Sequence, residues 1–378
     1  MVAQSSCVHL EPAVSGSSFM PARPAWLVLE DGATFGGVRI GAEGNAGGEV
    51  VFTTSMTGYQ EVMSDPSYRG QVVVMAYPLI GNYGFTPAYW EAAGPHVAGL
   101  IVREASAVAS HYLSHEPLDH FLRTHGVVGL AQVDTRALVR HLRIHGLKRG
   151  VIAEAPGQSA QAQAASLPSI SDQDLVAQVS RTSVEVQAGS GPRIALIDCG
   201  VKAGIISALR RRDCEIVLMP FTATANDVRA VAPDGVLVSN GPGDPAVLGD
   251  VIGTIHALLD RYPIMGVCLG HQLLALACGG RTHKMKFGHR GSNQPVIEAG
   301  SNRVMITTQN HGFAVDPEMP EALQITHHNL NDGTVEGLHH TSRPAFSVQF
   351  HPEGRPGPGD ADPLYDEFLG MIHQVSGA

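Results

Sequence analysis

The chain has 378 residues, of which 44% are hydrophobic and 16% charged, and its formal net charge is -10. These values are typical of a globular protein, and the length suffices for two domains that each bury a core. Because there is no dense Lys/Arg stripe, nucleic-acid binding is not expected. Arg210, Arg211 and Arg212 are expected to form a solvated helix face.

Neither a membrane span nor a signal peptide is predicted. No apolar run approaches the length of a membrane helix, and residues 1–24 lack a basic segment followed by an apolar one. The cysteines are odd in number and show no CxxC spacing, which favours free thiols in a cytoplasmic protein. They are Cys7, Cys199, Cys214, Cys268 and Cys278.

The first half of the chain predicts an α+β domain over residues 25–182, preceded by a leader over 1–24. Strand patterns at 25–40, 49–56 and 71–78 come first, and helical patterns at 118–126 and 134–146 follow. Residues 153–171 have the composition of a linker or surface loop, and 171–180 are expected to form a helix. We place the linker between the domains at residues 183–192.

The second half, residues 193–378, predicts an α/β domain. Short apolar strands at 193–200, 215–220, 235–240 and 263–268 alternate with helices at 201–213, 225–233 and 247–262. This alternation predicts a central, mostly parallel sheet covered by helices on both faces. After Arg281, β patterns dominate until a closing helix at 363–375. Ligands are expected at the carboxyl ends of the parallel strands.

The segment "GVCLG" places Cys268 between a strand and a helix. Flanking glycines tolerate the crowded turn of a nucleophile elbow, and a helix N-terminus favours the anionic form of a thiol. A buried, inert cysteine is the alternative interpretation for Cys268. Cys278, in the following helix, is expected to be inert.

A base for such a nucleophile is available in "QFHPEG". His351 and Glu353 are two residues apart, and Pro352 favours an extended backbone, which would direct both side chains to one face. The pair is weak by itself, because the chain has 19 histidines. The HxE sites of zinc deaminases also need a PCxxC motif, which the chain lacks.

A third motif, "SNGPGDP", follows the strand at 235–240. Gly241 and Gly243 leave backbone N–H groups accessible at the sheet edge, where an oxyanion hole can form. A plain turn remains the alternative. No Gly-Lys-Ser/Thr follows, so the motif does not match a phosphate-binding loop.

Together, "SNGPGDP", "GVCLGHQ" and "HPE" resemble the class I glutamine amidotransferase family. The segments "MKFGHRGSNQPV", "ITTQNHGFAV" and "EVVFTTSMTGYQEVMSDPSYRGQVVVMAYPLIGNYG" narrow the resemblance to the small, glutamine-hydrolysing subunits of carbamoyl-phosphate synthetases. The similarity runs from about Trp26 to the final helix. It implies a ligase complex in which the small subunit converts glutamine to glutamate and ammonia.

By this resemblance, Cys268 is the nucleophile that forms a glutamyl thioester, His351 is the acid and base, and Glu353 orients His351. The oxyanion hole would be formed by the N–H groups of Gly241 and Leu269. The residues that match the family's L-glutamine contacts are Ser67, Gly241, Gly243, Leu269, Gln272, Asn310, Gly312 and Phe313.

The resemblance also implies a partner and its cofactors. Ammonia would pass through a tunnel to a large subunit that binds ATP and magnesium and makes carbamoyl phosphate for arginine and pyrimidine biosynthesis. No cofactor or metal is expected in this chain, and the first domain is expected to dock the large subunit. The alternatives are an amidotransferase subunit of another synthase, or a non-catalytic docking or regulatory subunit. A metal-binding protein is a distant third, because adjacent histidines in a strand point to opposite faces.

Overall fold

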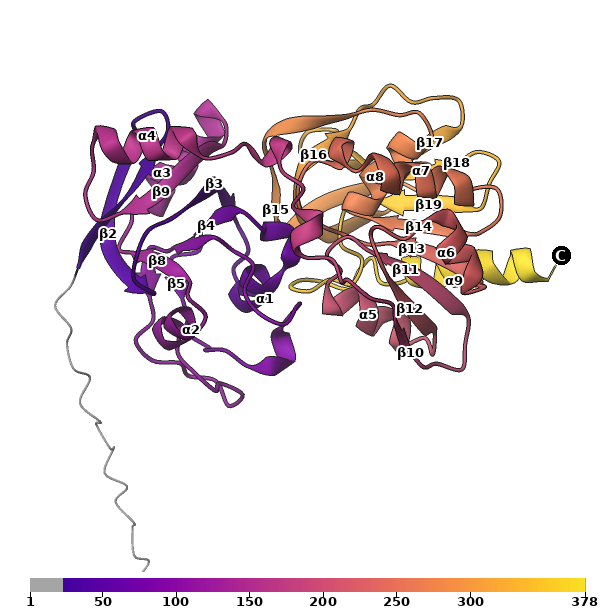
Figure 1. Cartoon of the computed structure of the whole chain (residues 1–378), viewed down its shortest axis with the longest axis horizontal. Coiled ribbons are helices and arrows are strands. Elements are labelled where there is room, and N and C mark those ends of the chain that lie inside the picture. The colour runs from indigo at the N-terminus through magenta and orange to yellow at the C-terminus, as the bar shows by residue number, and fades with distance from the viewer. Residues whose placement is uncertain (1–22, 378) are drawn as a thin grey trace, which may run out of the picture.

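The structure is a computed structural model that describes residues 23–377. Two domains lie side by side, a barrel formed by the first half of the chain and a larger α/β domain formed by the second (Figure 1). Residues 1–22 of the predicted leader, including Cys7, lie outside the described residues.

The first domain is a closed barrel with the strand order β1-β2-β8-β6-β4-β3-β9. Neighbours among β3, β4, β6 and β8 pair in parallel, and antiparallel pairs through β1, β2 and β9 complete the closure. Two further short strands, β5 and β7, pair with each other. The strands are β1 (Pro24–Leu29), β2 (Thr34–Gly41), β3 (Ala46–Thr53), β4 (Gln71–Met75), β5 (Leu79–Ile80), β6 (Gly99–Ile101), β7 (Glu104–Ala105), β8 (Val128–Ala131) and β9 (Lys148–Ala153).

Helices pack on this barrel and confirm the α+β class. Val50 and Phe52 share an apolar cluster with Leu138 of α3, whereas Val51 packs in another cluster with residues of α1 and α2, as the two-residue period of a strand requires. The helices are α1 (Tyr59–Ser64), α2 (Leu118–Thr124), α3 (Thr135–His145) and α4 (Gln158–Ser166), with 3-10 turns η1 (Pro66–Tyr68), η2 (Pro87–Tyr89), η3 (Ile170–Asp172) and η4 (Val176–Gln178).

Two local predictions for this half were wrong. The predicted linker or loop at 153–171 contains α4, because Ala160 and Ala164 bury their methyl groups against Val28 and Val151 of the barrel. The helix predicted at 171–180 is instead the pair of 3-10 turns η3 and η4.

The second domain contains a ten-stranded sheet with the order β10-β12-β11-β13-β14-β19-β18-β17-β15-β16. The five strands from β12 to β19 in this order are parallel, as predicted, and the remaining pairs are antiparallel. The strands are β10 (Glu185–Gln187), β11 (Arg193–Asp198), β12 (Glu215–Pro220), β13 (Gly235–Val238), β14 (Ile264–Val267), β15 (Thr282–Glu298), β16 (Val304–Val315), β17 (Leu323–Asn329), β18 (Val335–His340) and β19 (Ala345–Val348).

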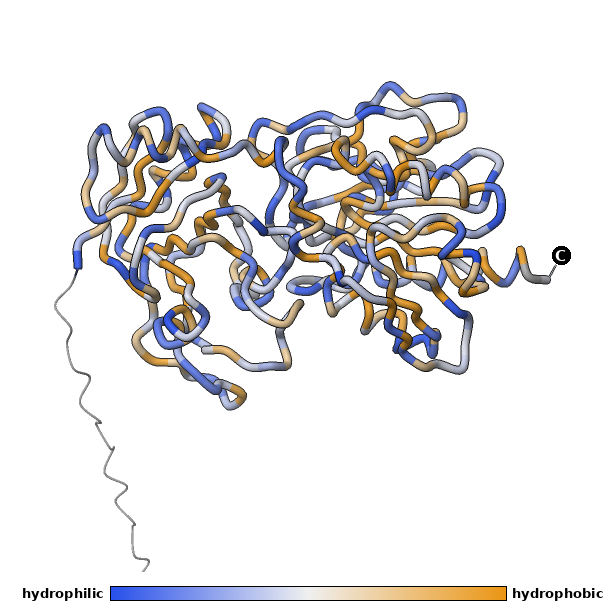
Figure 2. Tube along the Cα trace, viewed as in Figure 1, coloured by the Kyte–Doolittle hydropathy of each residue, from blue (hydrophilic) through white to orange (hydrophobic). Residues whose placement is uncertain are grey.

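Helices cover both faces of the parallel strands, which confirms the predicted layers. Ile255 of α7 and Leu273 of α8 pack on one face, and Leu209 of α5 and Phe368 of α9 pack on the other. In Figure 2, hydrophobic residues follow the inner strands of both domains and hydrophilic residues follow many outer loops. The helices are α5 (Ala203–Arg210), α6 (Ala225–Ala230), α7 (Gly249–Leu258), α8 (Leu269–Ala277) and α9 (Leu364–Ser376), with the 3-10 turn η5 (Pro245–Val247).

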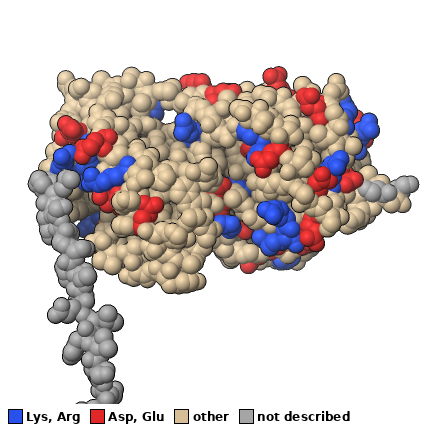
Figure 3. Space-filling view, turned by 60° about the horizontal axis from the view of Figure 1, so that its bottom comes forward, with Lys and Arg blue, Asp and Glu red and all other residues tan. Residues whose placement is uncertain are grey.

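The structure changes two further sequence interpretations. Part of the segment proposed as a linker, 183–192, forms β10, which pairs with β12 at the edge of the second sheet. Two of the three consecutive arginines are ion-paired: Arg211 and Arg212 contact Asp362 at 2.9 and 2.8 Å. Figure 3 shows basic and acidic side chains next to each other on the face that it views.

The domains are joined along β15. The backbone N–H of Thr54 donates to the carbonyl of Arg290 at 3.1 Å, and that of Leu147 donates to Lys286 at 3.1 Å. The barrel therefore forms backbone hydrogen bonds to Lys286 and Arg290 of a strand that belongs to the other domain. Among residues 23–377, no helix is both long and apolar enough to cross a lipid bilayer.

Candidate active site

Cys268 lies at the sharp turn between β14 and α8. Its backbone has φ 54° and ψ -101°, a conformation that costs a non-glycine residue about 1–3 kcal/mol. The turn needs glycine on both sides, because a Cβ on Gly266 would lie 2.5 Å from the Gly270 carbonyl oxygen and one on Gly270 would lie 2.1 Å from the Val238 oxygen. The side chain is only 2% exposed, yet it lines a pocket.

His351 and Glu353 form the predicted pair. A backbone bond to Thr308 of β16 holds His351, whose Nδ1 lies 2.7 Å from Oε1 of Glu353. His351 Nε2 is buried and has no hydrogen-bond partner among residues 23–377. Burial opposes the charged imidazole, but the Glu353 carboxylate outweighs it and raises the pKa of His351, with the Cys268 thiol contributing in the same direction.

Lys202 completes this network, and the sequence analysis did not identify it. It follows β11 at the carboxyl edge of the sheet and is 2% exposed. Its Nζ lies 2.9 Å from the same Oε1 of Glu353 that contacts His351. Burial alone would raise the pKa of Glu353, but Lys202 and His351 together lower it. The carboxylate is therefore ionised and lies between Lys202 and His351.

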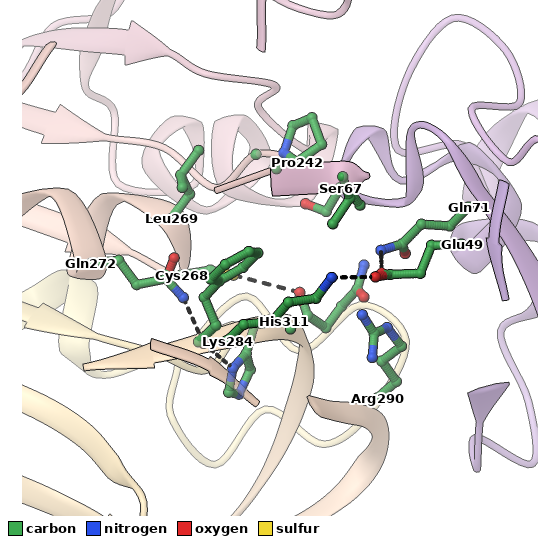
Figure 4. A pocket seen from close by; sticks show the side chains of 16 residues that line it. Glu49, Ser67, Gln71, Pro242, Cys268, Leu269, Gln272, Lys284, Arg290 and His311 are labelled. Carbon is green, nitrogen blue, oxygen red and sulfur yellow. Dashed lines mark hydrogen bonds and ion pairs between the residues drawn. The ribbon is translucent and has the colours of Figure 1, made fainter. Parts of the chain in front are cut away.

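The residues matched to glutamine contacts lie together. All eight line one pocket with Cys268, about 410 Å³ in empty volume, although they come from distant parts of the chain (Figure 4). Ser67 reaches the pocket from the barrel, where its Oγ accepts from Asn240 Nδ2 at 3.0 Å. Gln272 Nε2 donates to the Phe313 carbonyl at 2.8 Å and fixes one wall. The pocket therefore spans both domains.

The two N–H groups expected in the oxyanion hole are available. Leu269 is the first residue of α8, where backbone N–H groups have no partner within the helix. Gly241 has no room for a side chain, since a Cβ there would lie 2.1 Å from the Cys199 carbonyl oxygen. Within the described residues neither N–H group donates a hydrogen bond.

Comparisons with known proteins cover both domains. Residues 27–152 match the family description "Carbamoyl-phosphate synthase small chain, CPSase domain", and residues 195–371 match "Glutamine amidotransferase class-I". A carbamoyl phosphate synthase small chain from Bacillus caldolyticus is 49% identical over 93% of this chain and 97% of its own length. The chain belongs to the carbamoyl phosphate synthase small chain family.

Two further matches fill out the comparison. The pyrimidine-specific small chain of Bacillus subtilis is 46% identical over 92% of this chain and 95% of its own. A solved structure described as a putative GMP synthase subunit from Thermoplasma acidophilum aligns with 50% of this chain and 96% of its own, at 23% identity and a TM-score of 0.43.

Other residues of this small chain line the pocket without having been predicted. Glu49 of β3 and Lys284 of β15 form an ion pair across the domains at 2.7 Å, and Gln71 of β4 donates to Glu49 at 3.3 Å. Arg290 of β15 is a further cation (Figure 4). In the sequence, this group lies within or beside two segments that carry the family resemblance. Glu49 and Gln71 belong to "EVVFTTSMTGYQEVMSDPSYRGQVVVMAYPLIGNYG", and Lys284 and Arg290 lie beside or within "MKFGHRGSNQPV".

Within the described residues, one group of side chains has the atoms that a metal ion could bind, but ion pairs explain its arrangement better. His289, His311 and Glu336 have ligand atoms within 4.8 Å of one another. However, both nitrogens of His289 face carboxylates, at 2.9 Å from Asp332 and 3.5 Å from Glu336. This contact pattern is that of a buried imidazolium whose charge is balanced.

A second cavity of the small chain begins at His351. It has about 300 Å³ of empty volume and includes Lys202 and Asn310 in its wall. It shares Glu61, Arg355 and Pro356 with an open outer pocket of about 830 Å³. The cavity at His351 and the open outer pocket therefore adjoin each other.

Proposed function

We propose that this chain is the glutaminase subunit of a carbamoyl phosphate synthase, with Cys268, His351 and Glu353 as its catalytic triad. The observation that supports this best is that the strained cysteine and all eight residues matched to glutamine contacts line one pocket. His351, held by Glu353, lines a cavity that shares Asn310 with that pocket. Four free thiols within the described residues agree with the cytoplasmic location that we propose.

The mechanism follows from the positions of the side chains. His351 takes the thiol proton, and the sulfur of Cys268 attacks the carboxamide carbon of glutamine while the N–H groups of Gly241 and Leu269 stabilise the oxyanion. The C–N bond then breaks, and His351 returns the proton to the departing ammonia. Water, deprotonated by His351, hydrolyses the thioester to glutamate and releases the sulfur.

We propose that ammonia leaves through the second cavity. This cavity touches His351, the last group to contact the leaving nitrogen, and its neighbour opens to the surface. The wall of this cavity carries charged side chains of both signs, since Lys202 and Arg355 lie in it together with Glu61 and Asp65. Such a path supports delivery of ammonia to a partner.

The large, ATP- and magnesium-binding subunit would then dock over the outer pocket, on the first domain. The pocket is lined by Thr57 and His111, and the neighbouring residues Met56 and Tyr112 are 71% and 89% exposed. Large exposed apolar side chains beside an opening are typical of an interaction site. Carbamoyl phosphate from this complex would serve arginine and pyrimidine biosynthesis, and the name of the Bacillus subtilis relative supports the pyrimidine part of this proposal.

Reconstitution with a candidate large subunit tests the proposal. We expect Cys268→Ala to abolish synthesis from glutamine and to leave synthesis from ammonium salts unchanged, because only the first reaction needs the thioester. Equal loss with both donors would make the residue structural. Selective labelling of Cys268 by an electrophilic glutamine analogue would exclude a purely docking or regulatory subunit. We also expect glutamine hydrolysis to rise when the large subunit binds; equal rates with and without it would contradict this expectation.

A further inference from the structure

Arg290 is a buried cation without an ionic partner. It is 4% exposed, its Nη1 donates to the Phe287 carbonyl at 2.8 Å, and its Nε is buried without a hydrogen bond. No carboxylate within residues 23–377 forms an ion pair with it. An unpaired buried charge is unfavourable unless another charge compensates for it, so the guanidinium points to a nearby anion.

The other cations of the site are paired. Lys202 lies 2.9 Å from Glu353, and Lys284 lies 2.7 Å from Glu49. Burial lowers the pKa of Arg290, and the groups that oppose this effect are Tyr68, Glu49 and the thiolate form of Cys268. Tyr68 is neutral at ordinary pH because burial raises its pKa. Of these three groups, Glu49 already pairs with Lys284, so Cys268 is the one whose anionic form has no lysine or arginine partner within the described residues.

The fold places Arg290 in the same pocket as the nucleophile. Arg290 of β15 pairs across the ladder with Asn310 of β16, and the Asn310 carbonyl oxygen accepts from Cys268 Sγ at 3.6 Å. Arg290 and Cys268 line the same pocket (Figure 4). Arg290 is held there by its strand, because its carbonyl accepts from Thr54 of the barrel.

We propose that Arg290 supplies a constant positive charge that stabilises Cys268 as a thiolate. This role rests on the proposed function, in which Cys268 is the nucleophile and the leaving group of the thioester. His351 loses and regains its proton during each turnover, whereas a guanidinium remains charged throughout. Arg290 acts through the electrostatic potential in the pocket and is a positioning residue.

Several other groups face the thiol and set the background for its titration. His351 lies on the loop after β19, and His311 of β16 is kept neutral because burial lowers its pKa. Glu49 of β3 and Lys284 of β15 also line the pocket, and Tyr68 of η1 lines the adjoining cavity with Asp65 and Lys202. These groups are retained when Arg290 alone is changed.

The test is the pH dependence of Cys268 alkylation by iodoacetamide in the full chain without glutamine, quantified on the Cys268 peptide. In Arg290→Gln the charge is lost, and the rise of the alkylation rate with pH should move to a pH about one unit higher. At pH values below this rise, alkylation should slow about tenfold. Arg290→Lys should restore most of the reactivity. The control Arg281→Gln removes an exposed arginine just before β15 and should match the wild type.

Two results would overturn the proposal. One is an Arg290→Gln profile that superimposes on the wild type, and the other is an equal shift in the Lys and Gln variants, which would show that shape rather than charge matters. Failure of the proposed function would look different, because wild-type Cys268 would then be no more reactive than the other thiols. If Arg290→Gln does not fold, Arg290→Lys and Arg290→His replace it. The proposal is supported if the alkylation profile of Arg290→Lys matches the wild type and that of Arg290→His, measured at high pH, is shifted. Any other pair of results opposes the proposal.

Discussion

The two domains differ in how they contribute to the site. The α/β domain holds the thiol, and it also holds the imidazole and the carboxylate, which form one network of buried charges with Lys202. The barrel contributes Ser67, Glu49 and Gln71, which line the pocket but do not contact the His–Glu pair. This contrast indicates that bond making is confined to one domain and that the other shapes the space in which glutamine binds.

Among the substitutions that test this contrast between the domains, a change of Lys202 is expected to have the largest effect on activity. In Lys202→Met, the pKa of His351 should rise further, because the lysine charge that opposes the imidazolium is gone. Loss of a hydrogen bond between charged groups should lower kcat for glutamine about 10- to 100-fold. The pH–rate profile of glutamine hydrolysis should shift upward, while the ammonium-driven reaction should be unchanged.

Lys286→Met is the matched control, since Lys286 is exposed and only its backbone contacts the barrel. A Lys202→Met enzyme with an unshifted profile would show that the lysine supports the fold without tuning the imidazole.

A second, smaller effect concerns the stability of the catalytic domain. His271 in α8 is fully buried, and burial lowers its pKa from 6.5 to about 3. Its neutral form therefore stabilises the fold above pH 6.5, and this contribution declines as the pH falls from 6.5 towards 3, because only the unfolded chain takes up the proton. The loss is about 1.4 kcal/mol for each pH unit.

Urea unfolding at pH 6.5 and one unit lower would measure this loss. In His271→Asn, where the contact with Ser347 can be kept, the pH dependence should be shallower by that amount. His327, whose pKa is lowered to about 4, still contributes in the variant. Identical slopes in both proteins would assign the acid sensitivity to other groups.

The smallest effect is expected in the barrel. Ser67→Ala removes the acceptor of the Asn240 amide and should raise KM for glutamine about fivefold, which corresponds to about 1 kcal/mol, with little change in kcat. Ser110→Ala, at an exposed position of the same domain, should have no effect. A large fall in kcat for Ser67→Ala would contradict the view that the barrel contributes to binding and not to bond making.

Local patterns predicted the α/β domain well. Its strands alternate with helices along the chain, so neighbours in sequence are neighbours in space, and the glycines around Cys268 identify the turn. Closure of the barrel was not predicted, because β1 pairs with β9 more than a hundred residues later. The α4 helix was missed because its Ala- and Gln-rich sequence also suits a linker, and only packing on the barrel decides between them.

The charged residues of the site were likewise predicted only where they lie in local motifs. Cys268, His351 and Glu353 lie in recognisable motifs, whereas Lys202 looks like an ordinary lysine after a strand. Its role depends on a carboxylate 151 residues away in the sequence. Similarly, nothing in the sequence shows that Arg290 lacks an ionic partner, because that depends on which carboxylates the fold places around it.

The attachment of β15 to the barrel has a consequence for how the chain tolerates change. Since backbone atoms of Thr54 and Leu147 fix the strand that bears Lys284 and Arg290, an insertion or deletion in either barrel loop would displace charges in the neighbouring domain. The two halves are thus constrained to diverge together, and a chimera that combines halves of distant relatives would inherit a misaligned pocket even if each half folded correctly.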